Sequence, residues 1–170
     1  MQRRPSMLSA FRLSTAMFFG TVAMAADLPK EGTFSCTYYG FGTSKATKVG
    51  EERLLVVFDE NGLTLSNGFL DHMSWHCWGW TDFRSGIGQS QGIRVGTDRA
   101  GNQLVVDFAP GEKHATNQTS WNNPGTFTTG TGQFAGVSGG FSNVIHTDFR
   151  PLVEGTYHDV NNCQGTYKLP

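Results

Sequence analysis

The sequence predicts an all-β fold in which about eight strands close into a single antiparallel β-barrel. Apolar and polar residues alternate at period two along much of the chain from Thr33 to Leu169, and no stretch beyond residue 25 shows a helical period. Turn-forming residues recur at short intervals between these segments. Without helices to cover a sheet, such strands pack sheet on sheet or close on themselves, and closure removes exposed edges.

The first 25 residues are expected to form a secretory signal peptide, separate from the barrel. Three arginines precede the short apolar run Leu13–Met24, and the small residues of Ala23–Ala25 form a cleavage site. The run is too short to span a membrane, and an uncleaved membrane anchor is the alternative interpretation. The sequence thus predicts a signal peptide at 1–25, one barrel domain at 26–170, and a secreted or periplasmic location.

The net charge of the predicted mature chain excludes one class of partner. The whole chain has 13 Lys and Arg against 14 Asp and Glu, and removal of three arginines leaves 10 against 14, a formal charge of −4. Domains that bind nucleic acid usually carry a basic surface, so no nucleic-acid partner is expected. No later apolar stretch has the length of a membrane span. The oligomeric state is left open.

The first strands are predicted to be short and separated by turns. Thr33–Tyr39 and Arg53–Asp59 show the strand pattern, and the polar stretch Gly40–Gly50 between them is expected to be a loop. Glu60–Gly62 contains the Asn-Gly pair that hairpin turns favour. It is therefore expected to turn the chain into a further strand at Leu63–Ser66.

An aromatic strand is predicted at Phe69–Trp80. Trp75 lies on its more apolar side, together with Met73 and Cys77, and this side is expected to face the core. Trp78 and Trp80 lie on the other side, at the rim or on the outer surface. Exposed aromatic pairs often mark interaction sites, so this strand is the predicted ligand-binding element.

Two histidines of this strand raise the question of a metal site. His72 and His76 are four residues apart, a spacing that brings two ligands together on a helix. In a strand, four residues span about 13 Å, too far for one zinc ion with bonds of about 2 Å. No metal site is predicted, and His76 is instead assigned to the ligand-binding strand beside Trp78.

The remaining elements continue the pattern of short strands and turns. The predicted strands are Gln91–Thr97, Gln103–Phe108, Thr126–Thr129, Phe141–Phe149, Val153–Asp159 and Cys163–Leu169. The predicted connections are the loop Asp82–Gly88, the turn Asp98–Gly101, the long polar loop Pro110–Pro124 and the turn Val160–Asn162. Gly130–Gly140 has five glycines in eleven residues, which suits a tight corner or bulge with Phe134 pointing inward.

Three cysteines allow at most one internal disulfide. Cys36 lies in the first predicted strand and Cys163 in the last. If these strands are neighbours, a bridge between them joins the two ends of the barrel sheet. Pairing of Cys36 with Cys77 is the alternative.

The glycine-rich segment resembles that of a known family of barrels. Thr129–Gly140 is similar to the Gly-Thr-Gly-Lys-Phe-x-Gly-Ile-x-Gly segment of allene oxide cyclase and dirigent-like proteins. The chain over 32–170 also resembles a family of small secreted bacterial proteins, of no assigned activity, that is grouped with this barrel. Ser74–Gly79, Gly96–Asn102 and Gly165–Pro170 carry that part of the resemblance. It implies a calycin-like eight-stranded barrel. No catalytic residue of the cyclase matches a position here, and no cofactor is expected.

Three functions are consistent with this barrel. The first is binding, without catalysis, of a small apolar or aromatic ligand or of a partner surface. The residues assigned to it are Trp75, His76, Trp78, Trp80 and Phe134. The second is a cyclase, isomerase or dirigent-type enzyme whose cavity positions a reactive intermediate. The third is a structural envelope protein with a lumen filled by aromatic side chains. A hollow lumen favours the first two functions, and a filled one favours the third.

Overall fold

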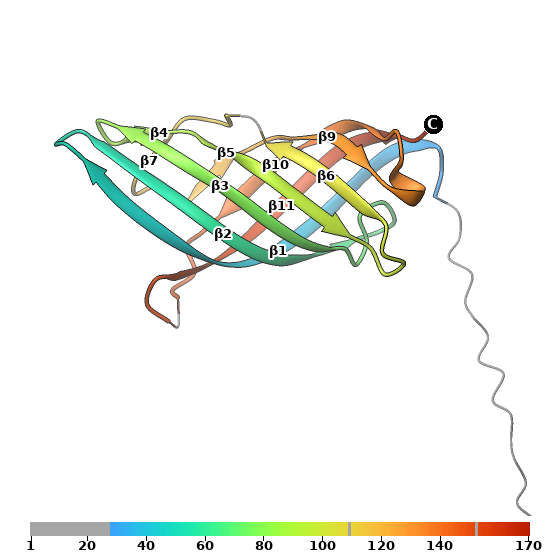
Figure 1. Ribbon diagram of the computed structural model, residues 1–170, viewed down its shortest axis with the longest axis horizontal. Helices are drawn as coiled ribbons and strands as arrows, with labels where there is room; N and C mark the ends of the chain where they lie inside the picture. Colours follow the sequence, from blue (N-terminus) through green and yellow to red (C-terminus); the bar gives the residue numbers. More distant parts are fainter. Residues whose placement is uncertain (1–27, 109, 152) are drawn as a thin grey trace, which may run out of the picture.

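The computed structural model describes residues 28–108, 110–151 and 153–170, which form one closed β-barrel (Figure 1). Eight strands make the ring: β1 (Glu31–Val49), β2 (Arg53–Ser66), β3 (Ser74–Arg84), β5 (Ser90–Thr97), β6 (Gln103–Phe108), β9 (Gly125–Gly130), β10 (Ser138–His146) and β11 (Thr156–Lys168). Their order is β2-β1-β11-β10-β9-β6-β5-β3, and β3 pairs back onto β2. Neighbouring strands of the ring are antiparallel. The predicted all-β closed barrel is confirmed. The predicted signal peptide, 1–25, lies outside the described residues.

Short elements flank the ring. They are β4 (Ile87–Gly88), β7 (His114–Ala115), β8 (Ser120–Asn122) and the 3-10 helix η1 (Gly132–Phe134). β4 pairs with β3 and β7, and β8 pairs with β10. β4 and β7 lie at the same end of the barrel as the β1–β2 hairpin, whereas the C-terminus lies at the opposite end (Figure 1). Within the described ranges, no helix is long and apolar enough to cross a membrane.

The first and last strands of the chain are neighbours in the ring. β1 and β11 pair from Glu31 opposite Lys168 to Thr43 opposite Thr156. Cys36 lies directly opposite Cys163, and the two form a disulfide with their Cα atoms 5.0 Å apart. The predicted pairing of these cysteines is therefore confirmed, and the bridge joins the first strand to the last.

The end of the barrel near the C-terminus is filled by aromatic side chains. Phe69, in the connection between β2 and β3, lies at the centre of this packing. Its ring stacks on Tyr167 at 3.9 Å between centroids and contacts Phe34, Phe127 and Phe134 at 5.2, 5.4 and 5.9 Å. Because these rings come from five separate segments, one packed cluster fixes the ends of many strands.

Three predicted turns or loops proved wrong because the strands continue through them. Gly40–Gly50 belongs largely to β1, Glu60–Gly62 lies inside β2, and Val160–Asn162 lies inside β11. Glu60–Gly62 and Val160–Asn162 pair with a strand on both sides, whereas 40–49 pairs with β2 throughout and with β11 only as far as Thr43; these ladder hydrogen bonds override the local turn preference. Their glycines serve packing instead: Gly42 lies opposite Tyr157, where an added Cβ would lie 2.8 Å from the tyrosine ring.

Other predicted boundaries shift for similar reasons. The aromatic strand begins at Ser74, because the chain before it folds inward as the Phe69 plug. β3 runs on to Arg84, so the predicted loop Asp82–Gly88 reduces to a tight turn in which Ser85 and Gly86 have φ of 48° and 80°. The predicted loop Pro110–Pro124 contains β7 and β8. The last predicted strand before the C-terminal pair spans Ser138–His146 instead of Phe141–Phe149.

Candidate functional site

The half of the barrel away from the aromatic plug is hollow. A cavity of about 370 Å³ lies among β2, β3, β5, β11 and the segment that contains β7 and β8. Its lining side chains include Val56, Phe58, Glu60, Cys77, Thr81, Phe83, Ser90, Arg94, Phe108, His114, Trp121, Asn123, Ile145, Tyr157 and Asp159. The lumen is thus filled at one end and hollow at the other. The hollow end is lined by both aromatic and titratable side chains.

Aromatic rings form much of the cavity wall. Phe58 and Phe108 stack at 6.2 Å between centroids. His114 stacks on Trp121 at 4.2 Å and meets the edge of Phe83 at 5.4 Å. Since β7 carries His114 and β8 carries Trp121, the segment between β6 and β9 brings this wall to the end of the barrel. Such a wall suits a flat apolar ligand.

Glu60 is the centre of a buried polar cluster beside the cavity. Its side chain is 4% exposed. Tyr38 Oη donates to Glu60 Oε1 at 2.5 Å, and Tyr157 Oη donates to Oε2 at 2.9 Å. Two donated hydrogen bonds stabilise an ionised carboxylate. The three residues come from β2, β1 and β11, whose inward positions the alternation of the strands places on one wall.

Arg94 lies against the same carboxylate. Its guanidinium sits 4.2 Å from the centroid of the Tyr38 ring and 3.9 Å from Glu60 Oε1. Burial alone would lower the pKa of Arg94, but the neighbouring Glu60 carboxylate acts in the opposite direction and the pKa is raised overall. Arg94 therefore stays protonated and neutralises Glu60, and a cation–π contact with Tyr38 adds to its stability.

Asp159 is a second buried carboxyl in this cluster, and it is 5% exposed. Burial first, and then the neighbouring Glu60, raise its pKa from 3.8 to about 7. Asn161 Nδ2 donates to Asp159 Oδ2 at 2.9 Å, whereas Asp159 Oδ1 has no hydrogen-bond partner among the described residues. Gly40 lies directly opposite, and only a residue without Cβ leaves room for this carboxyl. Asp159 can therefore hold or release a proton near neutral pH.

The remaining titratable groups of the cluster stay neutral. Burial raises the pKa of Cys77 to about 12, so its thiol is a poor nucleophile. Burial also raises the pKa values of Tyr38 and Tyr157, which act as hydroxyl donors. Burial lowers the pKa of His114, whose Nδ1 lies 3.3 Å from the carbonyl oxygen of Glu112. A neutral ring that donates from Nδ1 to this carbonyl keeps Nε2 as an acceptor.

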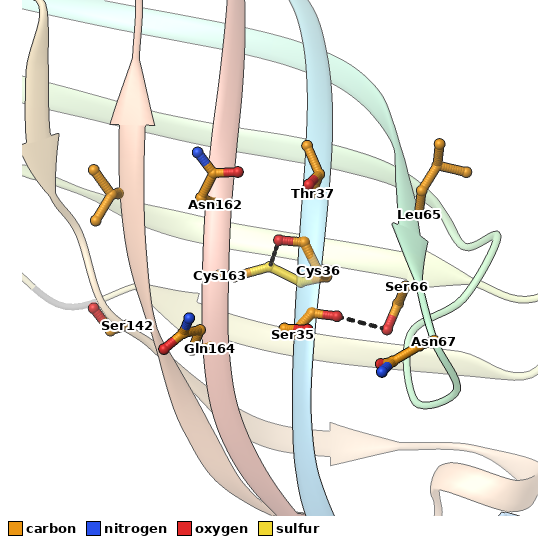
Figure 2. A pocket seen from close by; sticks show the side chains of 11 residues that line it. Ser35, Cys36, Thr37, Leu65, Ser66, Asn67, Ser142, Asn162, Cys163 and Gln164 are labelled. Atoms are coloured by element: carbon orange, nitrogen blue, oxygen red, sulfur yellow. Dashed lines mark hydrogen bonds between the residues drawn. A yellow bond between two sulfur atoms is a disulfide. The ribbon is translucent and has the colours of Figure 1, made fainter.

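A second concave surface lies on the outside of the barrel (Figure 2). Its volume is about 680 Å³, and its lining includes Ser35, Thr37, Asn67, Ser142, Asn162 and Gln164 around the Cys36–Cys163 disulfide. The lining side chains are uncharged, and the polar ones are mostly exposed to solvent. This groove is larger than the lumen cavity but open and chemically plain, so we place the candidate site in the lumen.

The predicted ligand-binding residues divide between two places. Trp75 and Phe134 are buried in the filled end, at 4% and 1% exposure, and Trp75 Nε1 donates to Thr64 Oγ1 at 2.6 Å. Trp78 and Trp80 face outward, at 39% and 43% exposure. His76 lies beside them, with its ring 3.8 Å from that of Trp78. The lumen cavity is lined by other residues.

The sequence prediction missed the polar cluster. The sequence pattern predicts a turn at Glu60 and a strand end at Asp159, and it gives no role to Arg94. A signal was available in the alternation of inward and outward side chains along each strand. Glu60 is two residues from Phe58 and therefore points to the same, inward side; Asp159 stands in the same relation to Tyr157. A charged residue on the apolar face of a strand indicates a buried polar site.

Comparison with known proteins identifies the type of barrel. No protein-family model matches the chain, and no curated protein sequence matches it. Among solved structures, the pterocarpan synthase dirigent protein GePTS1 is similar, with a TM-score of 0.51 and 10% identity over 91% of this chain and 100% of that chain. The fold is therefore a dirigent-like β-barrel, as the glycine-rich segment implied.

Proposed function

We propose that this protein binds a small, largely aromatic ligand in the hollow half of the barrel. The observation that carries the proposal is the cavity of about 370 Å³, with aromatic walls and a few buried polar groups on one side. Pockets for small molecules combine these features. An eight-stranded barrel whose lumen is partly unfilled holds one ligand of this size.

The polar cluster supports a functional role for the cavity. Burying Glu60, Asp159 and Arg94 costs free energy that apolar residues of similar size would not cost. Groups with perturbed pKa values beside a cavity are typical of functional sites. The same cavity speaks against the structural alternative, in which side chains fill the whole lumen.

Catalysis by positioning is the second candidate function. The similar solved structure is named a pterocarpan synthase and a dirigent protein. In this chain, the specific observation in favour is Asp159, a carboxyl beside the cavity with a pKa of about 7. Such a group can donate or accept a proton at neutral pH. An enzyme of cyclase, isomerase or dirigent type would bind its substrate in the same place.

A pair of matched variants tests lumen binding. Val56 faces the cavity, whereas the next residue, Val57, faces outward and is 45% exposed. Benzyl alcohol, a neutral aromatic probe, is titrated into the protein and followed by NMR. We expect Val56→Trp, which fills the cavity, to weaken binding at least about tenfold, and Val57→Trp to leave it unchanged. Equal affinities in two folded variants would contradict the proposal.

The outward Trp78 and Trp80 form a second proposed contact surface, for a partner or a ring-bearing ligand. Their exposure, and the close contact of the His76 ring with that of Trp78, support this role. We also propose a secreted or periplasmic location, because a disulfide such as Cys36–Cys163 persists in oxidising compartments. Cell fractionation together with the mass of the secreted chain tests that location.

A further inference from the structure

We infer that the lumen cavity selects an organic cation: a small aromatic amine whose ammonium group lies beside Asp159. This inference rests on the proposed function, since it names the class of ligand that the cavity takes. Three observations carry it: the balance of buried charges, the place of Asp159 in the cavity lining, and the aromatic walls.

The charge balance follows from the groups that face Asp159. They are Glu60 from β2, Arg94 from β5, Tyr38 from β1, Tyr157 from β11 and Cys77 from β3, with His114 of β7 on the cavity wall. The tyrosines, the thiol and the histidine are neutral. The Arg94 guanidinium lies 3.9 Å from Glu60 Oε1, and the opposite charges of these two groups cancel. One buried carboxyl therefore remains without a cation among the described residues.

The position of Asp159 allows a ligand to supply that cation. Asp159 lines the cavity, although its Oδ1 is buried against Gly40 of β1 and beside the Glu60 carboxyl. An ammonium group carries a full positive charge, so an amine bound beside the cavity-lining part of Asp159 balances the charge of this carboxyl. A buried charge without a partner costs free energy. Pairing Asp159 with a ligand's ammonium group therefore gives a large gain in binding free energy.

The aromatic walls favour a cation with an aromatic body. Phe58, Phe83, Phe108 and Trp121 line the same cavity. Rings attract a cation to their faces and stack on a ligand ring. A neutral alcohol of the same shape would gain the stacking but not the charge pairing. A carboxylate would add a further negative charge beside Glu60 and Asp159.

Proton release distinguishes this inference from simple apolar binding. Without a cation, the cluster reaches neutrality when Asp159 holds a proton. An ammonium group takes the place of that proton, so binding releases it. Since the pKa of Asp159 is about 7, amine affinity should rise about tenfold from about pH 6 to about pH 8, and proton release should fall over the same range.

The experiment compares three probes of nearly the same shape: benzylamine, benzyl alcohol and benzoate. Each is titrated calorimetrically into the purified protein at about pH 6 and about pH 8, in buffers of different ionisation enthalpy. We expect benzylamine to bind tightest at the higher pH and to release a proton at the lower pH. If benzyl alcohol or benzoate binds at least as tightly as benzylamine, the inference is overturned and lumen binding stands. If no probe binds, both are overturned.

A matched pair of variants locates the effect. Asp159→Asn removes the charge and keeps the shape, whereas Asp107→Asn changes an exposed carboxylate on β6. We expect Asp159→Asn to lose about tenfold in benzylamine affinity, and the pH dependence with it, while benzyl alcohol changes less than about twofold. Asp107→Asn should behave as the unsubstituted protein. An equal loss of affinity for benzylamine and benzyl alcohol would overturn the inference. If Asp159→Asn fails to fold, the proton release measured in different buffers for the unsubstituted protein decides, and its absence at about pH 6 overturns the inference.

Discussion

Asp159 makes the stability of the ligand-free protein depend on pH. Its pKa rises from 3.8 to about 7 in the folded state because of burial and Glu60. Below about pH 4 both states hold the proton, so there is no penalty. Between about pH 4 and about pH 7 the unfolded state has lost the proton while the folded state keeps it, so stability falls as pH rises, by at most about 1.4 kcal/mol per unit.

Asp159→Asn should remove this dependence. The amide keeps the shape of the carboxyl and does not ionise. We expect the free energy of unfolding of the variant, measured with urea, to exceed that of the unsubstituted protein increasingly from about pH 5 to about pH 8. Asp107→Asn on the exposed face of β6 serves as the control. Parallel pH profiles for Asp159→Asn and the unsubstituted protein would contradict a buried, protonated Asp159.

The difference between the predicted and the observed site begins with single residues. The side on which each residue of β3 lies was predictable, because side chains alternate along one strand. Trp75 and Cys77 point inward, and Trp78 and Trp80 point outward. The position of Glu60 was not, because the Asn-Gly pair that follows it favours a turn in isolation. Pairing with β1 and β3 on both sides overrides that preference, and the inward parity that Glu60 shares with Phe58 is informative only once the strand is known to continue.

At the scale of elements, glycines determine how closely two strands and their inward side chains pack. On β1, Gly42 lies opposite Tyr157 of β11. A Cβ there would lie 2.6 Å from the backbone oxygen of Asp59 and 2.8 Å from the Tyr157 ring. Glycine at this position lets β1 pack closely against β2 and β11, so the strand continues through a stretch whose composition suggests a loop. The hydroxyl of Tyr157 reaches Glu60 only because Gly42 leaves this space.

Gly42→Ala tests this packing. The added methyl group must displace the Tyr157 ring or the β2 backbone, and overpacking of this kind costs about 1–3 kcal/mol. We expect a loss of that size in the free energy of unfolding, together with weaker binding of benzyl alcohol in the lumen. Thr43→Ala, at the next and exposed position of β1, is the control. A Gly42→Ala protein as stable as the control would show that the strands adjust without cost.

At the scale of the whole molecule, the barrel is closed by contacts between distant parts of the sequence. The ring strands were predictable as a class, because alternation without helices leaves closure as the natural outcome. The division into a filled and a hollow half was not predictable. Phe69 lies in a connection, and its burial against Tyr167 and Phe134 depends on three segments meeting at one end. The position of the cavity follows from that plug.

The disulfide has its largest effect at this scale. Cys36 and Cys163 are 127 residues apart, and they join the first strand to the last. Without the bridge, folding must bring together two strands from opposite ends of the chain, at the largest loop-closure cost in the barrel. In the chain-entropy model a loop of this length contributes about 4–5 kcal/mol.

The double substitution Cys36→Ser and Cys163→Ser should therefore lower the free energy of unfolding by about 2–5 kcal/mol, measured with urea without reductant. Cys77→Ser is the control, since Cys77 is a buried free thiol outside the seam between β1 and β11. Adding reductant should lower the stability of the unsubstituted protein to that of the double variant and leave the double variant unchanged. If oxidised and reduced proteins unfold at the same urea concentration, the seam is held by strand pairing and by the Phe69 cluster alone.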